Sequence, residues 1–173
     1  MVPPSASESP NGEAQLEQRL SSVLIEFART LVTDFPIQAI LDHLVVRITA
    51  VLPVTAAGVT LISPGKHPRY VAASDESALR YEDLQNELGE GPCVASYKTG
   101  EAVTIPDLRV DDRFSQFTQR AIAEGVVAVF SFPLRHGEEQ LGALDLYRTT
   151  AGPLNDREMA VAQILADVAS SYL

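Results

Sequence analysis

Apolar residues recur every three or four positions in three parts of the chain, as they do along the buried face of an α-helix. The three apolar stripes are formed by Leu16, Leu20, Val23, Leu24, Phe27 and Leu31, by Ile40, Leu41, Leu44, Val45 and Ile48, and by Val161, Ile164, Leu165 and Val168. They predict one helix from Glu13, a second that Pro53 stops, and a last one over residues 152–173. Asp34 is the expected cap of the second helix, and Asn155 that of the last.

Shorter segments rich in β-branched residues lie between these helices and predict strands. Residues 56–63 and 69–74 flank the turn sequence PGKHP, and residues 126–135 and 139–148 flank HGE. Each pair predicts a hairpin, and therefore an antiparallel sheet. Residues 102–107 predict a further strand, which a Pro-Asp turn ends.

The segment between the two hairpins is predicted to be a mainly helical connection. We expect a helix over residues 75–88, a short one after the stretch LGEGPC at 88–93, and a third over 112–125. Helices at both ends of the chain cover one face of the sheet, so the connection must cross the other. A cavity between the sheet and the connection is then a candidate ligand site.

These elements together predict an α+β fold, an α/β sandwich with a central antiparallel sheet of about five or six strands. The terminal helices lie on one face of this sheet, and the helical connection 75–125 lies on the other. Residues 1–12, rich in Pro and Ser, are expected to be a disordered tail, and residues 13–173 a single domain.

Asp145 lies inside a predicted strand, where a charged side chain needs an explanation. Side-chain alternation places it on the same sheet face as Tyr147. One hypothesis is that Asp145 accepts a hydrogen bond from a ligand. The alternatives are an ion pair with Arg135 or Arg148, and simple exposure on a solvated face.

Composition narrows the possible classes of function. The 173 residues are 46% hydrophobic and 21% charged, as in a globular domain, and the net charge of −10 disfavours direct binding of nucleic acid. The sequence has no apolar run of the roughly 18–20 residues that a membrane helix needs. The N-terminal residues do not resemble a secretory signal, and a cytoplasmic location is expected.

Cys93 is the single cysteine, and its position allows two interpretations. Gly91 suits a turn or an N-cap and Pro92 the first helical position, so Cys93 falls in the first turn of a helix. A helix N-terminus can stabilise a thiolate, which makes a redox- or electrophile-sensing thiol one hypothesis. The other is a small, part-buried packing residue, which is the more common role of cysteine.

The sequence contains no Ser/His/Asp set, no paired cysteines and no phosphate-binding glycine loop, so we do not expect an enzyme. The stretch GEGPC is not a P-loop because it lacks the Lys-Ser/Thr pair. His43, His67 and His136 match no metal-binding spacing, and neither a metal nor a cofactor is expected.

Two stretches of the chain resemble the GAF domain family, the small-molecule-sensing relatives of the PAS fold. They are VFSFPLRHGEEQLGALDLYR, with its F-P-L and G-x-L-x-L elements, and EGPCVASYKTGEAVTIPDLRVDDRF. The second is similar to the GAF domains of actinobacterial regulators that carry an RNA-binding ANTAR module for transcription antitermination. Where that family often has Trp after DDR, this chain has Phe114, and no basic RNA-binding segment is present within it.

The resemblance implies a regulatory sensor domain that forms a homodimer through its terminal helices. It also implies a small-molecule ligand and an ANTAR-like output domain following residue 173. Alternatives are redox sensing through Cys93, a purely structural dimerisation module, and an enzyme of the GAF-fold methionine-sulfoxide reductase type, against which the single cysteine argues.

Two sets of candidate residues follow from this interpretation. The candidate pocket consists of Cys93, Phe114, Phe117, Phe130, Phe132, Asp145 and Tyr147. The candidate dimer interface consists of Leu16, Leu20, Val23, Phe27, Val161, Leu165, Val168 and Tyr172.

Overall fold

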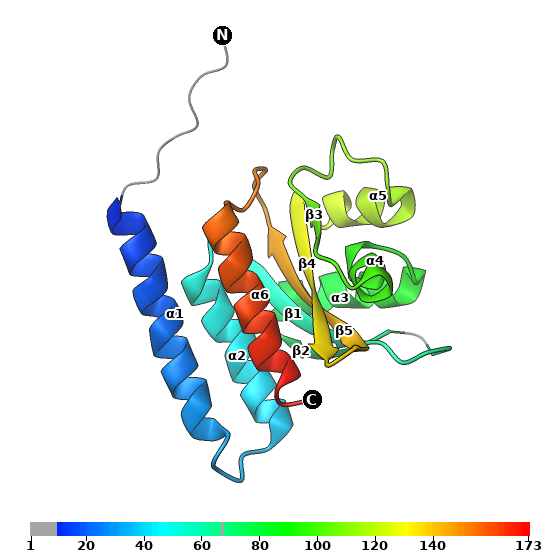
Figure 1. Cartoon of the computed structure of the whole chain (residues 1–173). Coiled ribbons are helices and arrows are strands. Elements are labelled where there is room, and N and C mark those ends of the chain that lie inside the picture. Colours follow the sequence, from blue (N-terminus) through cyan, green and yellow to red (C-terminus); the bar gives the residue numbers. More distant parts are fainter. Residues whose placement is uncertain (1–9, 67) are drawn as a thin grey trace.

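A computed structural model describes residues 10–66 and 68–173, which form three layers (Figure 1). The middle layer is a five-stranded antiparallel sheet in the order β2-β1-β5-β4-β3. Its strands are β1 (Ala56–Leu61), β2 (Arg69–Ala73), β3 (Val103–Ile105), β4 (Ala128–His136) and β5 (Glu139–Arg148). The two predicted hairpins, β1–β2 and β4–β5, are both confirmed.

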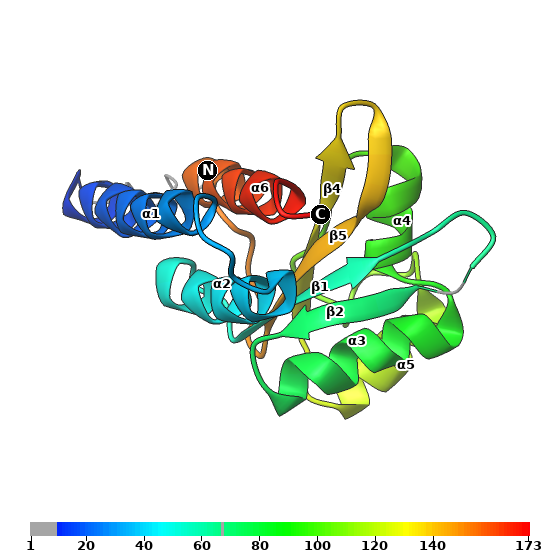
Figure 2. The ribbon, with the colours of Figure 1, turned by 90° about the horizontal axis from the view of Figure 1, so that it is seen from below.

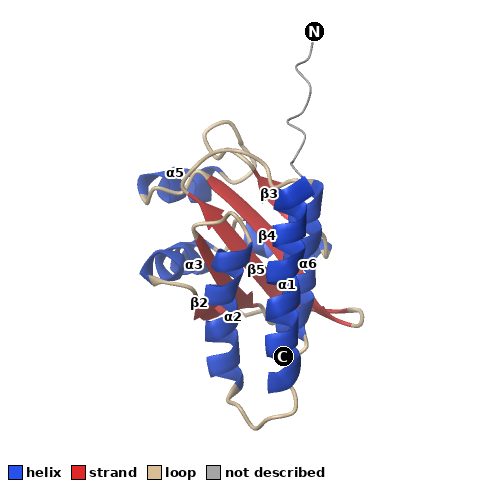
Figure 3. Ribbon diagram, turned by 90° about the vertical axis from the view of Figure 1, so that its left-hand side faces the viewer, coloured by secondary structure: helices blue, strands red, loops and turns tan. Residues whose placement is uncertain are grey.

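The terminal helices lie on one side of the sheet and the helices of the connection on the other, as the sequence predicted (Figure 2). The first layer holds the terminal helices α1 (Pro10–Thr30), α2 (Ile37–Val51) and α6 (Asp156–Ser170). Helices α2 and α6 pack on the strands, whereas α1 packs on the outer side of these two helices (Figure 2, Figure 3). The second layer holds α3 (Glu76–Leu88), α4 (Pro92–Thr99) and α5 (Ser115–Ala123) from the connection between the hairpins.

The ends of the helices differ from the prediction in three places. Helix α1 begins at Pro10, so residues 10–12 are helical rather than part of a tail, and residues 1–9 of the predicted tail lie outside the described residues. Pro36, not Asp34, is the N-cap of α2. Helix α6 is shorter than predicted, but Asn155 caps it in a capping box with Glu158.

The layer of terminal helices encloses the larger hydrophobic core, and this overturns the predicted dimer interface. Six of its eight residues are buried within this core, namely Leu20, Val23, Phe27, Val161, Leu165 and Tyr172. Leu16 and Val168 are half-buried against the same core. The buried positions of α1 and α6 are therefore used inside one chain: α6 packs on β4 and β5, and α1 packs on α2 and α6.

Helix α1 is fastened to this layer at its C-terminal end. The Tyr172 hydroxyl, just after α6, donates a hydrogen bond to the Phe27 carbonyl at 2.6 Å. The Phe27 ring also stacks on His43 of α2, with 5.6 Å between the ring centroids. Both ends of the chain are thus joined in one helical layer.

No helix among residues 10–66 and 68–173 has both the length and the apolarity to span a bilayer.

We predict that Leu165→Ala lowers the free energy of unfolding by about 2–5 kcal/mol, because it leaves a cavity in the core. The neighbouring variant Ile164→Ala is the matched control, since Ile164 is 39% exposed while Leu165 is fully buried. Its cost should stay below about 1 kcal/mol. Urea unfolding of both variants measures the difference, and equal losses would contradict the assignment of the buried face.

Candidate functional site

The sheet face that looks toward α3 and α4 carries a row of small and polar residues. Asp145 of β5 lies opposite Gly58 of β1 on one side and Ser131 of β4 on the other. Tyr147 follows on the same face of β5, as alternation predicted, and Thr60 follows Gly58 on β1. The central strands therefore present hydroxyl groups and one carboxyl group to the covering helices.

Glu82 of α3 reaches into this row from the opposite layer. Its side chain is fully buried, and it accepts a hydrogen bond from the Tyr147 hydroxyl at 2.7 Å and another from the Thr60 hydroxyl. A Cβ atom at position 58 would overlap the Glu82 carboxyl group. Only glycine at this position lets the carboxyl group approach the strand so closely.

Gln85, one turn further along α3, connects this row to the LGEGPC stretch. Its side-chain amide donates to the Tyr147 hydroxyl at 2.9 Å, and its carbonyl accepts from the Cys93 backbone N–H at 3.0 Å. Gly91 packs against the same side chain with φ at 137°, a conformation that favours glycine. As predicted, Gly91 is the N-cap and Pro92 the first residue of α4.

Glu90 fixes the same stretch to α5. Its carboxylate accepts hydrogen bonds from the backbone N–H groups of Gln116 and Phe117, both at 3.1 Å. Phe114, the N-cap residue of α5, provides no capping side chain. A residue distant in sequence therefore caps α5 and joins it to the turn before α4.

We call Thr60, Glu82, Gln85, Ser131, Asp145 and Tyr147 the acid cluster. Every member is at most 1% exposed. Among the described ion pairs, none includes Glu82 or Asp145. The site is thus a closed polar region that contains two carboxyl groups.

Asp145 is only partly satisfied within the acid cluster. One carboxyl oxygen accepts from the Ser131 hydroxyl at 2.5 Å, while Oδ2 is buried without a hydrogen-bond partner. Neither Arg135 nor Arg148 pairs with it in the described structure, so those two alternatives are wrong. A buried acceptor without a donor is costly and therefore calls for an explanation.

Burial changes the protonation of both acids. It raises the pKa of Asp145 from an ordinary 3.8 to about 6. Burial, and next the charge of Asp145, raise the pKa of Glu82 well above its usual range. Burial and mutual repulsion therefore both disfavour the state in which Glu82 and Asp145 are charged together.

Cys93 is a buried thiol, and its environment does not activate it. Burial raises the pKa of Cys93 well above the ordinary thiol value, and the nearby acids Asp145 and Glu82 raise it further. The expected stabilisation of a thiolate by the helix N-terminus is outweighed. Of the two interpretations, the packing residue fits the structure, and the reactive thiol does not.

The structure brings together only some of the predicted pocket residues. Asp145, Tyr147 and Cys93 lie around the acid cluster, while Phe117 and half-buried Phe114 pack in the adjoining small core. Phe130 and Phe132 were wrongly assigned to the pocket, because they point into the core on the opposite face. The alternation of side chains along β4 places Phe130 and Phe132 on the opposite sheet face from Ser131. It does not show which of the two faces the helical connection covers.

Glu82 is the functional candidate that the sequence reasoning missed. The buried side chains of α3 include Ala78, Tyr81, Glu82 and Gln85, which share one helical face at steps of three and four. An acid on the apolar face of an amphipathic helix was the available signal. It was missed because exposed acids are common on helices.

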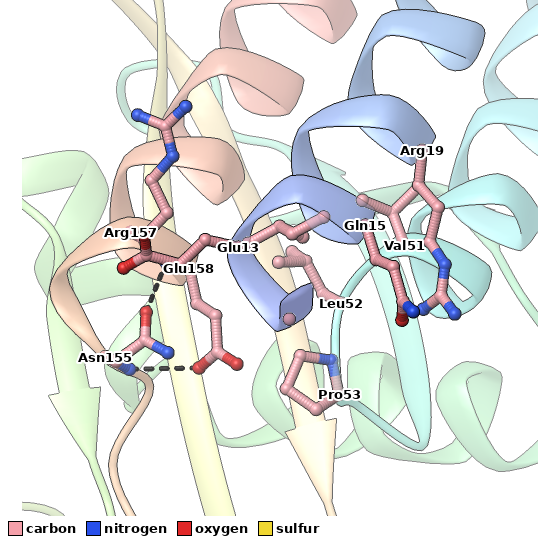
Figure 4. Close-up of a pocket in the computed structure, with 11 residues that line it drawn as sticks. Glu13, Gln15, Arg19, Val51, Leu52, Pro53, Asn155, Arg157 and Glu158 are labelled. Carbon is pink, nitrogen blue, oxygen red and sulfur yellow. Dashed lines mark hydrogen bonds between the residues drawn. The ribbon is translucent and has the colours of Figure 1, made fainter. Parts of the chain in front are cut away.

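A surface hollow of about 320 Å³ lies at the other side of the molecule, between α1, the end of α2 and the start of α6 (Figure 4). Its floor includes Leu16 and Leu52. Two of its polar groups already have partners: Glu158 belongs to the capping box, and Arg157 pairs with Glu17. We therefore favour the acid cluster as the functional site.

No three His, Cys, Asp or Glu side chains are grouped for metal binding in the part of the chain that the structure describes. His43 and His136 are exposed, and His67 lies outside the described residues.

Comparison with known proteins identifies the family of this sequence and fold. Residues 36–173 match the GAF domain family, whereas α1 precedes the matched segment. No curated protein sequence matches the chain.

Three solved structures share the fold at low sequence identity. The GAF domain of a phosphoenolpyruvate-protein phosphotransferase from Coxiella burnetii has a TM-score of 0.70 at 16% identity, covering 92% of each chain. The A. aeolicus NLH2 GAF domain in an inactive state has a TM-score of 0.65 at 16% identity, covering 91% of this chain and 96% of its own. Free methionine-R-sulfoxide reductase from Neisseria meningitidis, in complex with its substrate, has a TM-score of 0.65 at 14% identity, covering 99% and 95%. At these identities the likeness establishes the fold alone.

We predict that Glu82→Gln removes the contribution of Glu82 to the pH dependence of stability and leaves that of Asp145, because burial still raises the pKa of Asp145. Folding raises the pKa of both acids. Their contribution to the free energy of unfolding is therefore complete below about pH 4 and declines as the pH rises through about 6 and above. A glutamine stays neutral and can donate its amide N–H to Asp145 Oδ2. At pH 8 the variant should be about 1–3 kcal/mol more stable than the wild type.

Urea unfolding between pH 5 and pH 9 measures this effect. Asp83→Asn, an exposed change on the same helix, is the control and should keep the wild-type pH profile. A Glu82→Gln variant with the wild-type profile would show that Glu82 does not contribute to this pH dependence.

Proposed function

This chain belongs to the GAF domain family, and from that premise we propose that it is a regulatory sensor whose acid cluster binds a small molecule. GAF domains are generally sensor domains of signalling proteins. The observation that carries the proposal is the buried Oδ2 atom of Asp145, which accepts no hydrogen bond from a hydroxyl or N–H group of the described chain. It lies between the sheet and the helical connection, where a ligand would be enclosed by protein on both sides.

We propose that β4 relays binding to the terminal helices. Ser131 on one face of β4 hydrogen-bonds Asp145 in the acid cluster. Further along the same strand, the Pro133 carbonyl accepts from the Gln163 side chain of α6 at 3.3 Å, and the Arg135 N–H donates to the Ser170 hydroxyl at 3.1 Å. A shift of β4 at the site would change both contacts with α6.

The output that we propose is an ANTAR-like RNA-binding module that follows residue 173, and hence control of transcription antitermination. The support is the motif GEGPC with the later IPDL and DDR segments. We also propose a cytoplasmic location, for which that role is the reason.

We propose that the chain is not an enzyme. The methionine-sulfoxide reductases among the similar structures show that the fold accommodates catalysis. In this chain the one cysteine is buried, and its raised thiol pKa opposes nucleophilic attack. The acids of the acid cluster are likewise closed off from solvent.

We propose that the chain forms a homodimer through the outer surfaces of α1 and α6. The apolar stripes first assigned to this contact are buried within the chain. Ile25 of α1 and Ile164 of α6 remain exposed and are available for a partner copy.

The sensor proposal predicts that a screen of small metabolites stabilises the wild-type protein. A ligand present at about one hundred times its Kd adds about 2.7 kcal/mol, which raises Tm by several degrees. Asp145→Asn should lose the response, whereas Asp83→Asn should retain it. A screen at millimolar concentrations without any stabilising compound would overturn the proposed function.

The dimer proposal predicts that Ile25→Glu gives a monomer in multi-angle light scattering, with the fold unchanged in circular dichroism. A charge on the outside of α1 opposes association but touches no core residue. Val110→Glu, at an exposed apolar residue away from the terminal helices, is the matched control and should remain dimeric. A wild-type chain that is monomeric at high concentration would contradict the proposal.

A further inference from the structure

We propose that Glu82 is a built-in occupant of the ligand position, and that the ligand displacing it carries an amide, urea or lactam edge. This inference rests on the proposed function, since it names the chemical class that the same site would bind. It explains why the acid cluster is closed although it has the chemistry of a binding site.

The position of the Glu82 carboxyl group resembles that of a bound ligand. It comes from the covering helix, and its end lies over Gly58, where the strand has no side chain. The Thr60 and Tyr147 hydroxyl groups both donate to it. The sheet thus supplies the space and the hydrogen-bond donors. Glu82 supplies only the carboxyl group that occupies this space and accepts these hydrogen bonds.

The groups around the Glu82 carboxyl position determine which ligands can bind there in its place. Two hydroxyl groups converge on the position, and each can donate one hydrogen bond and accept others. The third group, Asp145 Oδ2, accepts from no hydroxyl or N–H group of the described chain, and a neutral Glu82 beside it is the group that can supply a proton donor. A suitable ligand must therefore accept from a hydroxyl group and donate to a carboxylate through adjacent atoms.

An amide edge has this pair of adjacent groups, a carbonyl oxygen and an N–H. A neutral carboxylic acid has them too, and the burial that raises the pKa of Glu82 favours this form. A carboxylate anion has no donor for Asp145 and would bring a second negative charge beside it. A ketone satisfies the hydroxyl groups but leaves Asp145 Oδ2 unpaired.

Helix α3 borders surface hollows and is joined to α5 by weak ion pairs, which favours its movement when Glu82 is displaced. Two surface hollows, of about 570 and 280 Å³, lie along its sides. The first is lined by residues of α2, β2 and the start of α3, and the second lies between α3 and α5. The ion pairs that join α3 to α5, Arg80 with Glu124 and Arg120 with Glu87, are largely exposed and therefore weak.

The test removes the Glu82 carboxyl group by mutation and supplies a small molecule of the same size from solution. Glu82→Ala deletes a fragment the size of acetic acid, and acetamide is its neutral amide analogue. We expect acetamide to raise the Tm of Glu82→Ala at pH 7.5 in a saturable manner, with little effect on the wild type. Acetone, which has the same shape but no N–H, should bind at least about tenfold more weakly, because it leaves Asp145 unpaired.

Leu44→Ala is the matched control, since it opens a cavity in the apolar core on the other face of the sheet. Acetamide should not stabilise it. If Glu82→Ala does not fold alone, refolding from urea with and without acetamide gives the same readout, and recovery only with acetamide supports the proposal. Equal effects of acetamide and acetone, or no effect of either, would overturn it.

The two proposals fail separately. Metabolites that stabilise the wild type while acetamide fails to act on Glu82→Ala would overturn the built-in occupant and leave the sensor function standing. Rescue by acetamide, with no metabolite bound by the wild type, would support the occupied site and overturn the sensor function.

Discussion

Two carboxyl groups enclosed between a sheet and its covering helices are the constraint on which this structure depends. Glu82 and Asp145 approach each other without a pairing cation in the described structure, and burial raises the pKa of both carboxyl groups. Burying charge in this way is unfavourable unless hydrogen bonds compensate. The hydroxyl groups of Thr60, Ser131 and Tyr147 provide that compensation, since each donates to one of the two acids.

The LGEGPC stretch serves this arrangement rather than any reaction of its cysteine. Gly91 leaves space for Gln85, whose side chain joins Tyr147 to the start of α4. Glu90 caps α5 from the same turn. Three helices of one layer are therefore held in register by hydrogen bonds from a few consecutive residues, and movement of the acid cluster would reach all of them.

The two faces of the sheet have different chemistry, which suits a sensor with a separate output. The face under α1, α2 and α6 is packed with aliphatic and aromatic side chains, and such close packing transmits displacement. The face under α3, α4 and α5 combines a smaller apolar core with the acid cluster. Strand β4 belongs to both, because successive side chains alternate between the faces. A displacement of β4 caused by binding on one face would therefore also move the side chains that it presents to the other face.

The sequence by itself determined the helices, the two hairpins, the layer order and the face on which Asp145 and Tyr147 lie. These features depend on periodicity and turn residues, which are local properties of the chain. Only the tertiary structure decided that Glu82 meets Asp145, that Phe130 and Phe132 face the terminal helices, and that the stripes of α1 and α6 are internal. It also decided that Cys93 is buried beside the two acids, an environment that raises the pKa of its thiol. The physical reason is the same in each case: burial and charge depend on which residues lie opposite in space, and periodicity along one segment does not specify its partner.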